Sequence, residues 1–482
     1  MRTTTVGLAF LGFTALTLPA AAATTANDAA KVQATLSAYL GSAAGAVTVT
    51  PDGDGFKTVL DLNSLMAKAK VNGAEMTVTP LEVNLTPEGN GKWKVKREGP
   101  LAITSKVPGE FTLNENFETY NIIGEYDESL AAFSTVDVSA KNITFTEEMT
   151  GKTGTPVKAD GKFDSISATG TATANPAGGV DIKFTEPFGP AILNETIGGK
   201  DDNPMNLQFK IASGNFDGSL TGTKSASLLE LLKFVVAHQD KDAMVKDQAG
   251  FKNLLNMLLP VFANITGTGN VNKLEVQTPM GLASAEKVGF GTSLNGLVKD
   301  GKLTETFNVE GLVLPPGLAP SWASSLLPKN VSLSTTVAGY DAETVAKAAI
   351  AAMDLSKDPS VPKDVSDGLA DLLLPKGTVD VSFEKTSINN DTYNISAEGN
   401  FQAGPAAMPS GKAHITAKGL DDIMKVVQAS PHEAGLQAGT AVIIAAKGMA
   451  KAETDGSLSW DVQATADGKL LVNGVDVSKL AK

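Results

Sequence analysis

The segment MTVTPLEVNLTPEGNGKWKVK, residues 76–96, contains a clear pattern of alternating apolar and polar residues around a turn. Apolar and polar residues alternate on both sides of residues 87–91 (PEGNG), and lysines flank Trp93 and Val95. Alternation with a period of two is typical of a strand that is buried on one face and wet on the other. The glycine-rich stretch between the two runs is typical of a tight turn. The segment therefore predicts an antiparallel hairpin.

The same arrangement occurs earlier, where Val47 and Val49 alternate with threonines, residues 51–55 (PDGDG) supply a turn, and residues 56–62 return. Asp52-Gly53-Asp54 begins like a calcium loop. Phe56 and Lys57 then stand where an oxygen ligand and the required glycine belong, so we interpret the loop as a hairpin turn.

Alternating segments of this kind continue along the whole chain, with turn residues between them. They predict a fold dominated by antiparallel sheet. The 47 glycines, many of them in or beside strands, suggest bends and bulges in a large curved sheet. Further strands are expected around Val136, Ile143, Leu207, Leu274, Phe307, Val331, Val379, Tyr393 and Leu458.

Helical patterns form a minority. Residues 28–40 have apolar positions at helical spacing. Residues 227–236 and 251–262 are apolar nearly all round, so we expect them to be buried. Residues 341–353 and 420–429 are amphipathic, and each begins near an aspartate that is expected to cap free amides.

A weak repeat accompanies these helices. Leu-Leu-Pro occurs at residues 258–260, 326–328 and 373–375, each time at the end of an expected helix. Two Gly-x-Asp steps, at residues 339–341 and 419–421, precede further helices. The fold class predicted is α+β, mainly β: a large curved antiparallel sheet with a minority of packed helices, and a pseudo-repeat in it. Chance recurrence of common tripeptides is the alternative to the repeat.

The start of the chain predicts export. A basic residue, an apolar stretch at residues 6–18 (VGLAFLGFTALTL) and an Ala-x-Ala boundary before Thr24 form a signal peptide at residues 1–23. We expect a periplasmic protein, with secretion left open, and an uncleaved anchor as the less favoured alternative. No later apolar run reaches about 18 residues, so no transmembrane segment is expected after signal cleavage. We divide the rest into a β-rich region at 24–222 and a mixed α+β region at 223–482, with one shared sheet left open.

The composition of the chain excludes several kinds of functional site and argues against one class of partner. The chain has no cysteine, which excludes disulfides, thiolate metal sites and cysteine nucleophiles. Its formal net charge of -13 argues against nucleic acid as a partner.

The sequence contains no recognisable catalytic, cofactor-binding or metal site. Its three histidines, His238, His414 and His432, have no metal-ligand spacing. We expect His414, which alternates with Ile415 in a strand, to face solvent. We therefore predict that the protein is not an enzyme, with a carboxylate-based active site as the remaining alternative.

Several loose motifs have ordinary explanations. S-x-x-K occurs at residues 284–287 and 382–385, and K-T-G at 152–154, but the order is reversed for a penicillin-interacting serine enzyme and S-D-N is missing. The acid pairs Asp201/Asp202 and Asp421/Asp422 fall in expected loops or helix starts, where carboxylates are usually solvated.

The last third of the chain resembles an uncharacterised family of exported alphaproteobacterial proteins, a domain of unknown function. The matching segments are SGKAHITAKGLDDIMKV at residues 410–426, DGSLSW at 455–460, DGK at 467–469 and VNGV at 472–475. The resemblance implies no catalytic residue. More distantly, the strand-rich chain with its D-G-x-L turns is similar to AsmA-like envelope proteins, a resemblance that implies lipid handling on a long curved sheet.

Two functions follow as expectations. The first is a non-catalytic envelope protein that binds a lipid or another hydrophobic ligand in a groove of the sheet. The second is a structural or protein-interaction module whose partner is another envelope protein.

Overall fold

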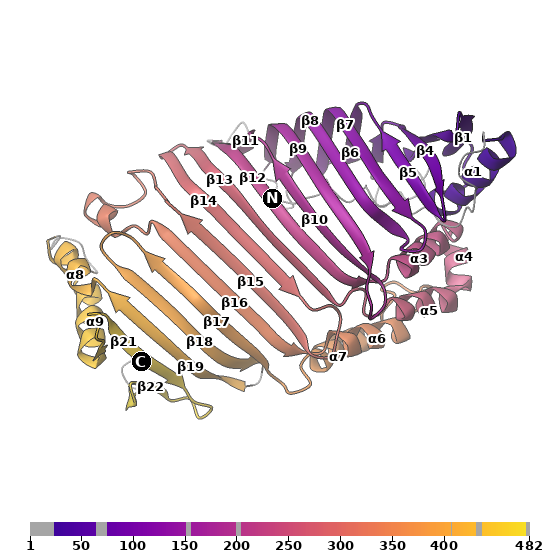
Figure 1. Ribbon diagram of the computed structural model, residues 1–482. Helices are drawn as coiled ribbons and strands as arrows, with labels where there is room; N and C mark the ends of the chain where they lie inside the picture. Colours follow the sequence, from indigo (N-terminus) through magenta and orange to yellow (C-terminus); the bar gives the residue numbers. More distant parts are fainter. Residues whose placement is uncertain are drawn as a thin grey trace. The chain divides into compact units, whose positions relative to one another are not determined.

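The computed structural model describes residues 24–63, 75–150, 156–198, 204–405, 407–429 and 436–478 (Figure 1). The predicted signal peptide lies outside these residues. The chain forms two compact units: an N-terminal unit within 1–265 and 347–366, and a C-terminal unit within 266–346 and 367–482. The expected boundary after residue 222 falls inside the N-terminal unit, and the division into domains stays a prediction.

The N-terminal unit holds twelve of the described strands and, before them and after them, four helices. The strands are β1 (Val47–Asp52), β2 (Gly55–Leu60), β3 (Glu75–Val78), β4 (Leu81–Gly89), β5 (Lys92–Arg97), β6 (Leu101–Val107), β7 (Phe111–Asp127), β8 (Ala132–Thr150), β9 (Pro156–Ala174), β10 (Val180–Phe188), β11 (Ala191–Ile197) and β12 (Met205–Thr223). The helices are α1 (Ala26–Leu40), α3 (Ser225–Ala237), α4 (Lys241–Lys246) and α5 (Gln248–Leu258).

These strands pair antiparallel in the order β1–β2–β4–β5–β7–β8–β9. The first half of β7 pairs instead with β6, which pairs with β3. The strand expected at residues 76–85 is therefore two strands with different partners. The break falls at Thr79-Pro80, because proline has no N–H to donate to a ladder.

Two Gly-Pro pairs divide longer strands in the same way. Gly99-Pro100 separates β5 from β6 along β7, and Gly189-Pro190 separates β10 from β11 along β9 and β12. At the first break the buried Arg97 side chain donates hydrogen bonds to the carbonyl oxygens of Gly99, at 2.7 Å, and of Tyr120. The Gly99 carbonyl oxygen also accepts the Tyr120 N–H at 2.8 Å, so the guanidinium adds hydrogen bonds to the backbone where the ladder is interrupted.

The C-terminal unit is a long antiparallel meander. Its strands are β13 (Asn264–Thr278), which begins at the boundary, β14 (Gly281–Leu294), β15 (Gly301–Glu310), β16 (Asn330–Tyr340), β17 (Val379–Asn389), β18 (Asn394–Gly404), β19 (Ala407–Lys418), β20 (Lys451–Ala452), β21 (Leu458–Ala464), β22 (Leu470–Val472) and β23 (Val475–Asp476). Its helical segments, of which α6 and α7 cross the boundaries, are η2 (Ser321–Leu326), α6 (Ala342–Ala352), α7 (Lys363–Leu373), α8 (Leu420–Gln428) and α9 (Leu436–Met449).

From β14 to β19 each strand pairs with the next, and β19 then pairs with β21. The short strands β20 and β22 lie on β21, and β23 follows β22. The predicted fold class, α+β and mainly β with antiparallel strands and a minority of helices, is confirmed.

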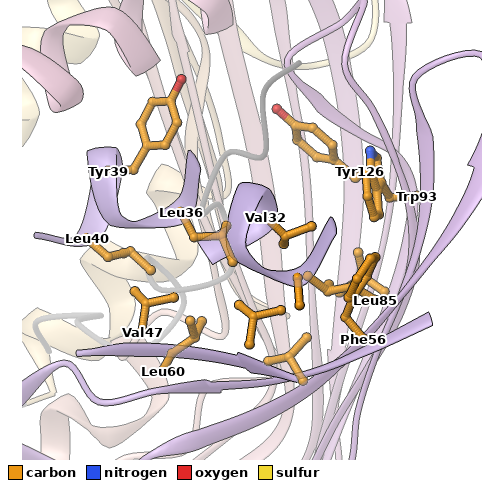
Figure 2. Packing of buried hydrophobic residues seen from close by; sticks show 14 of the residues in the cluster. Val32, Leu36, Tyr39, Leu40, Val47, Phe56, Leu60, Leu85, Trp93 and Tyr126 are labelled. Atoms are coloured by element: carbon orange, nitrogen blue, oxygen red, sulfur yellow. The ribbon is translucent and has the colours of Figure 1, made fainter. Parts of the chain in front are cut away.

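The largest buried cluster lies where α1 covers β1, β2, β4 and β5 (Figure 2). The helix begins with a capping box in which the Thr25 hydroxyl accepts the Asp28 N–H at 3.2 Å. Val32 and Leu36 point from the helix into the cluster, where Leu85 and Trp93 are also nearly inaccessible. This is the helix expected at residues 28–40, which begins two residues earlier.

The prediction that residues 227–236 and 251–262 are buried was wrong. They form α3 and α5, in which only Leu229 and Leu258 are buried, and α5 ends at Leu258. The two helices pack on each other, and α3 packs on α1. Most of the other apolar side chains of the two helices are half-buried, and those of Leu228, Val235 and Met257 are exposed.

The repeated motifs have a common local structure. Pro260, Pro328 and Pro375 each follow the end of a helical segment, α5, η2 and α7. Gly339 and Gly419 both adopt φ +84° at the end of a strand and before a helix. Glycine takes this left-handed conformation without a steric penalty.

The expectation that glycines mark bulges is confirmed at a few positions only. Ladder irregularities fall at Gly89, Gly301 and Gly404. Gly161 and Gly218, by contrast, lie in unbroken ladders under aromatic rings of the neighbouring strand.

Candidate functional site

The histidines occupy structural positions where they are described. His238 follows α3, with Nδ1 2.8 Å from the Phe234 carbonyl oxygen and Nε2 3.3 Å from Asp247 Oδ2. His414 lies on β19, with Nδ1 2.8 Å from Asp461 Oδ1 on β21. Its side chain is 43% exposed, in line with the expected solvent-facing position. His432 lies outside the described residues. Over the ranges that the structure describes, no group of three or more histidines and acids could hold a metal ion.

The loose motifs do not assemble into a catalytic group within the described residues. Both S-x-x-K segments lie in strands, β14 and β17, where side chains three residues apart do not share the face of a helical turn. Asp421 pairs with Lys447, and Asp422 with Lys425 at 2.8 Å. The K-T-G segment and Asp201/Asp202 lie outside the described residues.

The sheet of the C-terminal unit has two chemically different faces. Register partners across β14, β15 and β16 place Phe290, Phe307 and Leu333 in one row. Because alternate residues share a face, the same side carries Phe401, Ile415 and Trp460 farther along the sheet. We call this side the apolar face.

The other side of this sheet, the polar face, is held by hydroxyl and amide pairs between strands. Thr304 Oγ1 lies 2.8 Å from Thr336 Oγ1. The Ser332 hydroxyl donates to Asn308 Oδ1 at 2.8 Å. The polar face is therefore suited to water, whereas the apolar face is not.

The apolar face is not fully covered. The side chains of Phe290, Phe307 and Leu333 are 47%, 42% and 43% exposed. Three large apolar side chains in register on adjacent strands form a contiguous apolar patch, and patches of this kind often mark a site where a partner or ligand binds. We call it the exposed row. The alternation of Val288 and Phe290 in the sequence could have predicted that their side chains share one face of the sheet. No pattern in the sequence shows which part of that face is uncovered.

The N-terminal unit also has an apolar face, and it contains half-buried acids. Glu115 on β7 and Glu186 on β10 share this face with Phe117 and Phe188. Burial raises the pKa of Glu186, and burial together with the nearby Glu147 raises the pKa of Glu115. Acids in this setting carry an electrostatic cost when they ionise.

Comparison with known proteins finds no matching family model, no matching curated protein and no matching solved structure. The resemblance to exported proteins of unknown function and to AsmA-like proteins therefore stays a prediction. Among the helices that the structure describes, none has the length and hydropathy needed to span a membrane.

Proposed function

We propose that this is a non-catalytic protein of the bacterial envelope that binds the acyl chains of a lipid along the apolar face of its C-terminal unit. The exposed row of Phe290, Phe307 and Leu333 carries the proposal. The expected signal peptide supports a periplasmic location, where a lipid has to be shielded from water.

The chemistry of the row favours a hydrocarbon chain as its occupant. The row presents rings and a branched alkyl group and no hydrogen-bonding side chain. The next row on the same face holds Thr292, whose hydroxyl donates to Glu305 Oε1 at 2.7 Å. A lipid whose acyl chain lies on the exposed row would therefore have these polar groups next to its headgroup.

The energy is sufficient for reversible binding. Burying one methylene contributes about 0.8 kcal/mol. About six methylenes on the row would contribute roughly 5 kcal/mol before the cost of association, so we expect a lipid that exchanges rather than one held permanently.

Native mass spectrometry and lipid extraction of the protein purified from its own periplasm test this proposal. We expect a lipid to be released from the wild type and to be lost from Phe307→Ser. Val475→Ser is the matched control, because Val475 is an apolar side chain 58% exposed on β23, outside the exposed row. A ligand-free wild type, or equal loss in both variants, would contradict the proposal.

A structural or protein-interaction module is the second candidate. It is favoured by the apolar side chains that α3 and α5 leave exposed, Leu228 at 38%, Val235 at 40% and Met257 at 58%. Native mass spectrometry that shows a bound envelope protein and no lipid, with the partner lost on Met257→Ser, would favour this candidate.

A further inference from the structure

The polar face of the C-terminal unit is hollowed where β17, β18, β19, β21 and the β22–β23 hairpin meet. The hollow has a volume of about 820 Å³ and is open to solvent. It lies on the side of the sheet opposite the exposed row, so it is independent of the lipid site.

Two rows of side chains in register line its floor. In the first row, Asn400 on β18 faces Lys412 on β19, which faces Gln463 on β21 and then Leu471 on β22. Strands in a sheet lie about 4.8 Å apart. The row therefore offers amide, ammonium and amide groups at regular intervals, followed by a half-buried alkyl group.

In the second row, Glu398 on β18 faces His414, which faces Asp461. Asp461 is engaged, because it accepts hydrogen bonds from His414 and, at 2.6 Å, from Lys451 Nζ. The pKa of Asp461 is lowered mainly by the hydrogen bond from Lys451 and then by the one from His414. This carboxylate stays ionised and lines the hollow on β21.

Several groups in the hollow keep their hydrogen-bonding capacity free. Within the part of the chain that the structure describes, Glu398, Asn400, Lys412 and Gln463 make no side-chain hydrogen bond or ion pair. These four supply both donors and acceptors. A ligand that bonds to all of them must itself both donate and accept.

Charge narrows the class of ligand further. The hollow holds the carboxylates of Glu384, Glu398 and Asp461 as well as the ammonium groups of Lys412 and Lys451. A polyanion would meet the carboxylates and a cation would meet the lysines, so neither sign is favoured. A neutral ligand rich in hydroxyl groups fits both the mixed charge and the free amides.

We propose that this hollow binds a neutral saccharide chain. Each sugar hydroxyl can accept from an amide or ammonium group and donate to a carboxylate or amide oxygen. Leu471 offers an apolar surface for the C–H face of a sugar ring, and the open shape suits an oligosaccharide that crosses several strands.

Isothermal titration of the full mature chain with N-acetylchitotetraose and with cellotetraose tests this proposal, and a heparin tetrasaccharide serves as an anionic comparator. We expect at least one neutral probe to bind and the anionic probe to bind more weakly. The double variant Lys412→Met/Gln463→Leu should weaken binding by about tenfold or more, as loss of a hydrogen bond to a charged group would. Gln463→Glu, which conserves shape, should weaken it as well without affecting folding.

The matched control is Lys302→Met/Gln277→Leu, which makes the same changes at exposed positions on β15 and β13, outside the hollow. It should retain affinity within about twofold. The proposal is overturned if neither neutral probe binds at millimolar concentration, if the heparin fragment binds more tightly, or if the control loses as much affinity as the double variant.

Discussion

The ring of Phe184 on β10 lies over Gly218, its register partner on β12, so that a Cβ added to Gly218 would be 2.3 Å from Cζ of the ring. Phe188 covers Gly214 in the same way on the same pair of strands. In the C-terminal unit, Phe383 covers part of Gly399. Such pairs shield the backbone beside a glycine and replace the packing that its missing side chain would supply.

The first prediction follows from this contact. Gly218→Ala should lower the free energy of unfolding by about 1–3 kcal/mol, because the new Cβ must displace the ring or the strand. Thermal unfolding followed by circular dichroism measures the loss.

A double-mutant cycle separates the ring from other causes. In a Phe184→Leu background, where the ring is gone, Gly218→Ala should cost clearly less. An unchanged cost would show that the ring does not set the requirement for glycine at this position.

A glycine without a neighbour should behave in the opposite way. A Cβ at Gly368, inside α7, would meet no atom within 4 Å. Gly368→Ala should therefore stabilise the protein by about 0.5–1 kcal/mol, because alanine loses less conformational entropy in a helix. Chemical denaturation checks the sign, and a destabilised variant would be inconsistent with this account.

The aspartates near the starts of α6 and α8 should contribute differently to the stability of the protein. Asp341 Oδ1 accepts the Thr344 N–H at 2.8 Å, so it caps α6 as the sequence predicts. Asp421 instead lies inside the first turn of α8 and pairs with Lys447, and Gly419 stands at the cap position.

Asp341→Ala should therefore cost about 0.5–2 kcal/mol of stability. Asp421→Ala removes a surface ion pair and should cost clearly less stability than Asp341→Ala. Equal losses in parallel urea titrations would argue against a capping role for Asp341.

The half-buried Glu186 should make stability depend on pH. Burial raises its pKa above the ordinary value of 4.5. The fold thus favours the protonated acid, and this contribution is complete below pH 4.5 and is lost as the pH rises through the raised pKa. Glu186→Gln, which stays neutral, should raise Tm at pH 7 and lose this advantage below pH 4.5.

An exposed acid provides the comparison for Glu186. Glu75→Gln on β3 removes a carboxylate that is exposed. It should leave the pH profile of Tm unchanged. A similar gain at pH 7 in both variants would point to the net charge of the protein, and not to burial of Glu186, as the cause.

Local patterns in the sequence were sufficient to predict many of the helices and strands and the fold class. Alternation at Val47 and Val49, the turn at residues 51–55 and the helical spacing from Val32 to Leu36 depend on near neighbours, so each could be predicted and each is confirmed. The absence of cysteine excluded whole classes of site without any structure.

Long-range packing sets which faces of the sheet are covered and which residues contact one another, and neither could be predicted from local patterns. Alternation assigns Phe307 and Asn308 to opposite sides of β15, but the exposure of Phe307 depends on what packs above it. The hollow on the polar face likewise depends on the register of Glu398, His414 and Asp461, which come from three strands separated in the sequence. For the same reason, the sequence could not predict whether α3 is buried or exposed to solvent. The local pattern sets the chemistry of a surface, and long-range packing sets whether water reaches it.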